Sequence, residues 1–135
     1  MARKESEEQK AFVKWAEMNG HYCIENLTGA VFAGRGAVAW KYHQLMGAKA
    51  GVHDLILITK SGRLLWLEVK RPDGVPSDIS KSQREFALRL RGLQHQVYGF
   101  GCEELIRAVL DFERGADFTD PVIYRKGKVE KLFKE

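Results

Sequence analysis

The sequence predicts a single small α/β domain in which helices alternate with short strands. The chain has 135 residues, a length that fits one domain with one hydrophobic core. Apolar residues recur with helical spacing in some segments and form short continuous runs in others. Glycine and proline separate these segments, so helices and strands follow one another along the chain.

The first part of the chain is expected to contain two helices with a strand and a loop between them. Residues 5–18 carry apolar side chains at helical spacing, and Asn19-Gly20 is a suitable helix end. Residues 21–25 are short and apolar enough for a strand. Residues 29–36 hold three glycines and are expected to form a loop, and residues 37–46 fit a second helix, which Gly47 closes.

The middle of the chain predicts a β-hairpin. Residues 55–58 form the near-continuous apolar run that is typical of a central strand. Lys60-Ser61-Gly62 supplies a turn, and residues 63–70 form the returning strand. Pro72 and Pro76 then interrupt the regular pattern, so the hairpin ends before them.

A helix at 80–93, a strand at 96–100 and a helix at 103–114 complete the expected domain, which spans residues 1–115. Residues 116–135 are expected to form a C-terminal appendage. Its two apolar segments either pair as a β-hairpin through Lys126-Gly127 or pack on a partner chain.

Composition narrows the functional classes. The net charge is +4, with +5 over residues 21–101 and −1 over the remainder, which suits a polyanionic partner without requiring one. Two cysteines are too few for a disulfide framework, and no CxxC, HExxH or GxxxxGK motif is present. No apolar stretch is long enough for a membrane span and no secretory signal is visible. We therefore expect no membrane association and a cytoplasmic location.

Two carboxylates and a lysine converge in the predicted hairpin. Glu68 and Lys70 are two residues apart in a strand, so their side chains share one face about 7 Å apart. Asp54 precedes the neighbouring strand. Carboxylates grouped in this way can bind Mg²⁺, which can polarise a phosphate and activate water, while Lys70 neutralises developing charge.

The E-x-K spacing alone is not specific. The same triplet occurs as Glu8-Gln9-Lys10, where helical geometry keeps the two charged side chains from sharing a face. In the strand, Glu68 and Lys70 have a second interpretation as a solvated ion pair on an exposed strand end, and the pattern alone leaves both open.

Thirteen residues separate the segments Gly51-Val52-His53-Asp54 and Glu68-Val69-Lys70. Together the two segments resemble the PD-(D/E)xK nuclease superfamily, and within it the VRR-NUC (virus-type replication-repair nuclease) family. Four further segments are similar to that family's pattern in the same order. They are Glu5 to Gln9 leading to Trp15, Asn26 with the glycine-rich 29–36 segment, Ala48 to Gly51, and Ile79 to Gln83. The resemblance covers roughly residues 5–112 and implies a restriction-endonuclease-like core, a central mixed sheet flanked by helices.

The resemblance implies a Mg²⁺ or Mn²⁺ site. Asp54, Glu68 and the Val69 carbonyl would be ligands, Lys70 would position water or stabilise the transition state, and Gln83 would line the site. An acidic residue of the first helix would complete the cluster. Glu5 fits by its offset from Gln9, whereas Glu8 shares a face with Phe12 and Trp15.

Two of these positions carry an alternative or a departure from the family pattern. Ser80 and Gln83 also form a capping-box pattern, which alone would explain the pair. His53 stands where the family usually has Pro, which removes a fixed φ and offers an imidazole to a phosphate.

Arg35, Lys41, Lys49 and Arg71 are candidate phosphate contacts, with a solvated basic face as the alternative.

The expected function is a metal-dependent endonuclease that hydrolyses DNA phosphodiester bonds. The family's associations point to branched or flap DNA in phage replication, repair or recombination, and to a homodimer as one way to reach two strands. The alternative is a catalytically inactive DNA-binding module with the nuclease fold, although the retained Asp54, Glu68 and Lys70 argue against it.

Overall fold

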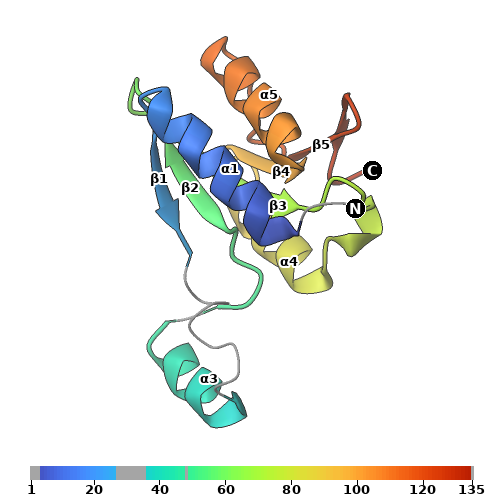
Figure 1. The fold of residues 1–135 in the computed structure, drawn as a ribbon. Helices are drawn as coiled ribbons and strands as arrows, with labels where there is room; N and C mark the ends of the chain where they lie inside the picture. The colour runs from blue at the N-terminus through green and yellow to red at the C-terminus, as the bar shows by residue number, and fades with distance from the viewer. Residues whose placement is uncertain (1–3, 27–35, 48, 135) are drawn as a thin grey trace.

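The computed structural model describes residues 4–26, 36–47 and 49–134. The elements follow the chain as one alternating series of helices and strands (Figure 1). They are α1 (Glu5–Met18), β1 (Tyr22–Glu25), α3 (Gly36–Leu45), β2 (Leu55–Ile58), β3 (Leu64–Lys70), a short 3₁₀ turn (Pro76–Asp78), α4 (Lys81–Leu90), β4 (Gln96–Phe100), α5 (Cys102–Glu113), β5 (Val122–Arg125) and β6 (Lys128–Lys131).

One mixed sheet of six strands, in the order β1-β2-β3-β4-β5-β6, forms the centre of the molecule. The pairs β1–β2, β2–β3 and β5–β6 are antiparallel, whereas β3–β4 and β4–β5 are parallel. The predicted α/β class and the predicted hairpin of β2 and β3 are therefore confirmed. Each parallel connection carries a helix, α4 before β4 and α5 before β5, as such crossovers usually do.

Helices α1 and α5 pack side by side on one face of the sheet (Figure 1). The inward residues of β3 that meet them are Leu65, Leu67 and Val69, all fully buried. Their alternation is the period-2 pattern of a strand whose two faces have different neighbours. Gly99 in β4 lets α5 approach closely, because a Cβ there would collide with the Leu105 side chain.

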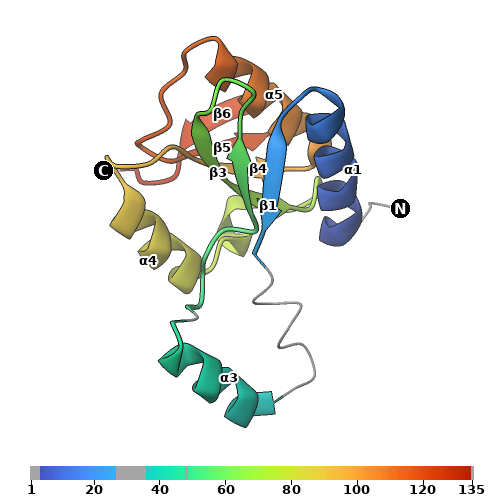
Figure 2. The ribbon, with the colours of Figure 1, turned by 90° about the vertical axis from the view of Figure 1, so that its left-hand side faces the viewer.

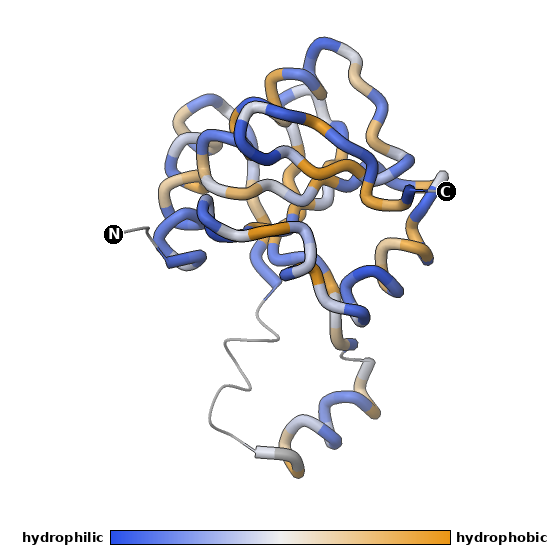
Figure 3. Tube along the Cα trace, turned by 90° about the vertical axis from the view of Figure 1, so that its right-hand side faces the viewer, coloured by the Kyte–Doolittle hydropathy of each residue, from blue (hydrophilic) through white to orange (hydrophobic). Residues whose placement is uncertain are grey.

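Helix α4 lies on the opposite face of the sheet (Figure 2). Ala87 of α4 packs with Tyr98 and Phe100 of β4 and with Ile123 of β5 in a second hydrophobic cluster. Every residue of β4 is buried because helices cover both of its faces. Along α4 residues 81–85 are hydrophilic and the hydrophobic side chains follow in the second half of the helix (Figure 3), where Ala87 is buried.

Two boundaries differ from the sequence pattern by more than one residue. The predicted helix at 80–93 ends at Leu90, where Arg91 leaves the helical conformation and Gly92 follows with a φ of +80°. In the predicted appendage, β5 and β6 form a hairpin, and β5 also pairs with β4. The sheet thus continues past residue 115, and these strands belong to it.

Helix α3 lies apart from the sheet in the views of Figures 1 and 2. Most of the predicted loop at 29–36 lies outside the described residues, and Gly36 begins α3. Across the described ranges, no helix combines the length and apolar character needed to cross a membrane.

Gly51 brings the segment before β2 against the first turn of α4. Its φ is +81°, a backbone conformation that L side chains rarely adopt. A Cβ at this position would collide with the Ser82 carbonyl oxygen and lie 2.5 Å from the Ser82 carbonyl carbon and 2.9 Å from the Gln83 nitrogen. Only glycine therefore allows this backbone contact.

We expect Gly51→Ala to destabilise the fold more than Gly62→Ala. Gly62 has a similar φ of +88°, but a Cβ there would have no described atom within 4 Å, so alanine meets only the left-handed penalty of about 1–2 kcal/mol. At Gly51 the collision with α4 adds roughly 1–3 kcal/mol. Urea unfolding of both variants measures the difference, and equal losses would contradict the close contact.

Candidate active site

Asp54 joins the start of β2 to the end of β3. The backbone N–H of Val69 donates to Asp54 Oδ2 at 2.9 Å, and the backbone N–H of Asp54 donates to Glu68 Oε1 at 3.1 Å. The Asp54 carbonyl accepts the N–H of Asn26, which follows β1, at 2.8 Å. Three neighbouring strands therefore hold this aspartate at one end of the sheet.

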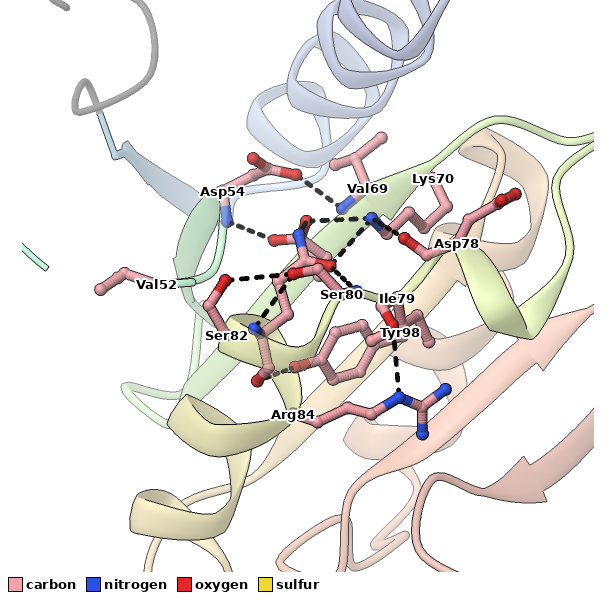
Figure 4. Close-up of polar contacts among 12 residues, drawn as sticks. Val52, Asp54, Val69, Lys70, Asp78, Ile79, Ser80, Ser82, Arg84 and Tyr98 are labelled. Carbon is pink, nitrogen blue, oxygen red and sulfur yellow. Dashed lines mark hydrogen bonds and ion pairs between the residues drawn. The ribbon is translucent and has the colours of Figure 1, made fainter. Parts of the chain in front are cut away.

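Glu68 and Lys70 lie on the face of β3 that α4 covers. Their exposed fractions are only 3% and 7%, so the interpretation as a solvated pair on an exposed strand end is wrong. Lys70 Nζ lies 3.8 Å from Glu68 Oε2. Lys70 Nζ also donates to the Asp78 carbonyl at 3.2 Å and to Gln83 Oε1 at 3.0 Å (Figure 4). These contacts hold the ammonium between Glu68, Gln83 and the 3₁₀ turn.

Gln83 connects the carboxylate, the lysine and the helix end. Its Nε2 donates to Glu68 Oε2 at 2.6 Å, while its Oε1 accepts from Lys70 Nζ and from the Ser80 backbone N–H. The Gln83 N–H in turn bonds the Ser80 hydroxyl, which completes the capping box. Capping and contact with the site are two roles of one side chain, and neither excludes the other.

The pKa of Glu68 is raised well above the usual range of a glutamate. Burial is the main cause because it disfavours the charged carboxylate, and the negative charge of Asp54 adds to it. The Lys70 ammonium and the Asp54 backbone N–H act in the opposite direction. Glu68 therefore keeps its proton to a higher pH than an exposed glutamate does, and additional positive charge nearby would favour its ionised form.

The pKa of Asp54 is raised as well, again mainly by burial, and the negative charge of Glu5 contributes. The hydrogen bond from the Val69 N–H and the charge of Lys70 oppose the shift without cancelling it. Glu5 also raises the pKa of Glu68. The first helix thus adds a third negative charge to the electrostatics of this pair.

The structure separates the roles of Glu5 and Glu8. Glu8 is buried, and its Oε1 accepts the Cys102 N–H at 2.8 Å, where a carboxylate stabilises the N-terminus of α5. Glu5 lines a pocket of about 470 Å³ together with Lys70, Arg71 and Asp78. Of the two candidate acidic residues of α1, Glu5 is therefore the one beside Lys70.

The donor set fits a divalent cation in part. Among residues 4–26, 36–47 and 49–134, no group of three or more Asp, Glu, His or Cys side chains is close enough to hold a metal ion. Asp54 and Glu68 are a neighbouring pair of carboxylates with raised pKa values, a donor type that suits Mg²⁺ and Mn²⁺. The backbone N–H of Val69 donates to the Asp54 carboxylate, so the backbone of Val69 lies beside this pair. A cation on this pair would relieve their repulsion.

The candidate phosphate contacts lie in different places. Lys49 lines a pocket of about 460 Å³ with Asp54, Glu68 and Gln83. Arg71 is exposed beside the pocket of Glu5 and pairs with Asp73 at 3.1 Å. Lys41 lies exposed on α3, and Arg35 falls outside the described residues. Lys49 thus lines the same pocket as the acidic pair, whereas Arg71 lines the pocket of Glu5 and Lys70.

Sequence reasoning missed several neighbours of the site. The Asp78 carbonyl receives Lys70, the Tyr98 hydroxyl donates to the Gln83 carbonyl at 3.2 Å, and Gly51 sets the approach of α4. The 3₁₀ turn and the parallel pairing of β3 with β4 bring these groups together. Gly51 carried a local signal, a glycine just before the acidic motif, whereas Asp78 and Tyr98 carried none.

His53 does not present an imidazole to the site's solvent. It is 1% exposed, and its Nε2 lies 2.7 Å from Gln96 Oε1. Burial lowers its pKa to about 4, so the ring is neutral near pH 7. The expectation that His53 approaches a phosphate is therefore wrong, because the ring is enclosed in the core.

No protein-family model, curated protein or solved structure matches this chain.

We expect Asp54→Asn to raise the melting temperature at neutral pH while removing the acidic pair. The amide oxygen can still accept the Val69 N–H, and both the cost of burying a charge and the repulsion from Glu5 are lost. Because the folded-state pKa of Asp54 is raised, ionisation destabilises the folded protein as pH rises from the ordinary value of 3.8. The variant's advantage should therefore grow above that pH, to about 3–5 °C.

Thermal unfolding between pH 4 and 8 with a chelator present measures this effect. Asp73→Asn is the matched control, since Asp73 is exposed and its carboxylate bonds the Arg71 guanidinium at the surface. A loss of stability for Asp54→Asn at every pH would contradict the unfavourable ionisation of Asp54 in the folded protein.

Proposed function

We propose that this protein is a metal-dependent endonuclease that hydrolyses DNA phosphodiester bonds with Mg²⁺ or Mn²⁺, and that it belongs to the VRR-NUC family of PD-(D/E)xK nucleases. The observation that carries the proposal is the buried group of Asp54, Glu68 and Lys70, which Gln83 links by hydrogen bonds to both partners of the E-x-K pair. A structural role alone does not explain two adjacent carboxylates with raised pKa values.

The architecture supports this proposal without being specific to it. The resemblance implies a mixed sheet flanked by helices, with the acidic motif on a hairpin and a following helix that contributes to the site. Strands β2 and β3 form an antiparallel hairpin, and α4 brings Gln83 to it. The restriction-endonuclease-like core is accordingly part of the proposal.

Each residue of the group would have a distinct role. Asp54, Glu68 and the Val69 carbonyl would hold the cation, with Glu5 beside them, and a bound Mg²⁺ or Mn²⁺ supplies Lewis-acid stabilisation of the phosphate and a more acidic water. Lys70 carries positive charge that would stabilise an anion developing at the phosphate. Gln83 orients Lys70 and Glu68, since it accepts from one and donates to the other.

The surroundings favour a nucleic-acid strand as the substrate. The 460 Å³ pocket that contains Asp54 and Glu68 is also lined by Lys49 and Trp40, a cation and an aromatic side chain. On the other side of Lys70, Arg71 lines the neighbouring pocket. We propose DNA as the polymer, branched or flap DNA as the preferred form, and a homodimer where two strands are cut.

We expect Asp54→Asn and Lys70→Ala to lower Mg²⁺-dependent DNA cleavage by at least about a hundredfold, the typical effect of removing one transition-state contact. Lys10→Ala is the matched control, because it changes the lysine of the other E-x-K triplet, which lies exposed on α1. The assay uses duplex, single-stranded, flap and four-way DNA with Mg²⁺, Mn²⁺ or EDTA.

Undiminished cleavage by either site variant would contradict the assignment. Salt-sensitive DNA binding without any metal-dependent product from the unaltered protein would favour the inactive DNA-binding module instead.

We also expect Glu5→Gln to weaken metal-dependent cleavage, by roughly tenfold, because it removes a negative charge that acts on both Asp54 and Glu68. Glu7→Gln, an exposed change on the same turn of α1, should leave cleavage unchanged. Titration of activity with Mg²⁺ separates the two variants. An equal response would remove Glu5 from the site.

A further inference from the structure

His53 occupies a closed aromatic pocket directly before Asp54. Its ring lies 5.0 Å from that of Tyr98 and 5.4 Å from that of Phe86, in both cases edge to face. Trp66 of β3 packs on the same cluster, with ring centroids 6.1 Å apart. These contacts fix the ring of His53 from β3, β4 and α4 together.

The direction of the hydrogen bonds in this pocket is determined. Gln96 Nε2 donates to the Ala87 carbonyl at 3.0 Å, and a carbonyl can only accept. Gln96 Oε1 therefore faces His53, and His53 Nε2 must be the protonated nitrogen that donates across 2.7 Å. His53 Nδ1 is then an acceptor, buried and without a hydrogen-bond partner among the described residues.

These bonds connect three elements that meet at the candidate active site. His53 precedes β2, Gln96 begins β4, and Ala87 belongs to α4. The same helix carries Gln83, whose backbone carbonyl accepts the Tyr98 hydroxyl. The link leaves Nδ1 buried without a hydrogen-bond partner among the described residues, a cost that a fully bonded network would not have.

We propose that His53 and Gln96 are positioning residues, which fix the Asp54 backbone against Glu68 by tying the start of β2 to β4 and α4 through one buried hydrogen-bonded link. A proline at position 53 would fix φ covalently through its ring. Here a tertiary contact takes over that constraint. The effect on catalysis rests on the proposed function, whereas the effect on the geometry of Asp54 does not.

Three substitutions separate the hydrogen bond from the packing. His53→Phe keeps an aromatic ring but removes the donor, and His53→Gln keeps a terminal N–H but removes the ring. Gln96→Leu removes the acceptor and leaves His53 unchanged. The double variant His53→Phe/Gln96→Leu tests whether the two residues act as one unit.

The first readout is amide hydrogen exchange in protein labelled with ¹⁵N-valine. The Val69 N–H donates to Asp54 Oδ2 and so reports the position of Asp54 directly. Val109, buried in α5 on the opposite face of the sheet, reports global stability in the same spectrum. The second readout is calorimetric titration with Mn²⁺.

We expect His53→Phe and Gln96→Leu to speed exchange at Val69 at least about tenfold more than at Val109, and to weaken Mn²⁺ binding roughly tenfold to a hundredfold. His53→Gln should keep most of the protection of the Val69 N–H and most of the affinity for Mn²⁺. The double variant should show no larger change in either quantity than the single variants do. Equal acceleration at Val69 and Val109, including complete loss of the fold, would assign both residues to the core alone and overturn the proposal. Normal Val69 exchange and Mn²⁺ binding in His53→Phe, combined with loss of both in His53→Gln, would overturn the proposal as well.

The same experiment distinguishes this proposal from the proposed function. If the unaltered protein binds no Mn²⁺, the nuclease assignment fails, and the comparison of Val69 with Val109 still decides the positioning role. If Mn²⁺ binds but the variants match the unaltered protein at both readouts, only the positioning role fails.

Discussion

The reciprocal bonding between Asp54 and the end of β3 is the constraint on which the site depends. Asp54 accepts the N–H of Val69 and donates its own N–H to Glu68, so two backbone groups and two carboxylates are fixed by one pairing of strands. The antiparallel register of β2 and β3 sets this pairing, with Leu55 opposite Leu67. A shift of one residue would turn Glu68 and Lys70 into the hydrophobic face that α1 and α5 cover.

The site combines burial with unfavourable charge, and the surrounding elements supply the compensation. Burial raises the pKa values of both carboxylates, and the negative charge of Glu5 adds to both shifts, while that of Asp54 adds to the shift of Glu68. Lys70, Gln83 and two backbone N–H groups nevertheless hold the carboxylates in place. Such an arrangement lowers stability locally and is typical of sites that bind a cation or a substrate. The rest of the fold, with two hydrophobic clusters on opposite faces of the sheet, provides the stability that this requires.

Sequence patterns predicted the local elements well and their long-range partners poorly. Period-2 alternation in β3 correctly placed Glu68 and Lys70 on one face, and the turn at Gly62 correctly paired β2 with β3. The parallel neighbours β4 and β5 left no such sign, because parallel pairing is set by helix packing rather than by a local turn. For the same reason, the core position of His53 and the capping of α5 by Glu8 became visible only in three dimensions.

Because Gln83 serves the helix and the site at once, the range of residues tolerated at this position is narrower than either role alone would allow. A capping box accepts glutamate as readily as glutamine. Glutamate at position 83, however, would set a carboxylate against Glu68 Oε2, where the amide now donates at 2.6 Å. Alanine at position 83 would leave both the Ser80 N–H and one N–H of the Lys70 ammonium without their present acceptor. Substitution at this position is therefore limited both by the capping of α4 and by the carboxylate of Glu68 beside it.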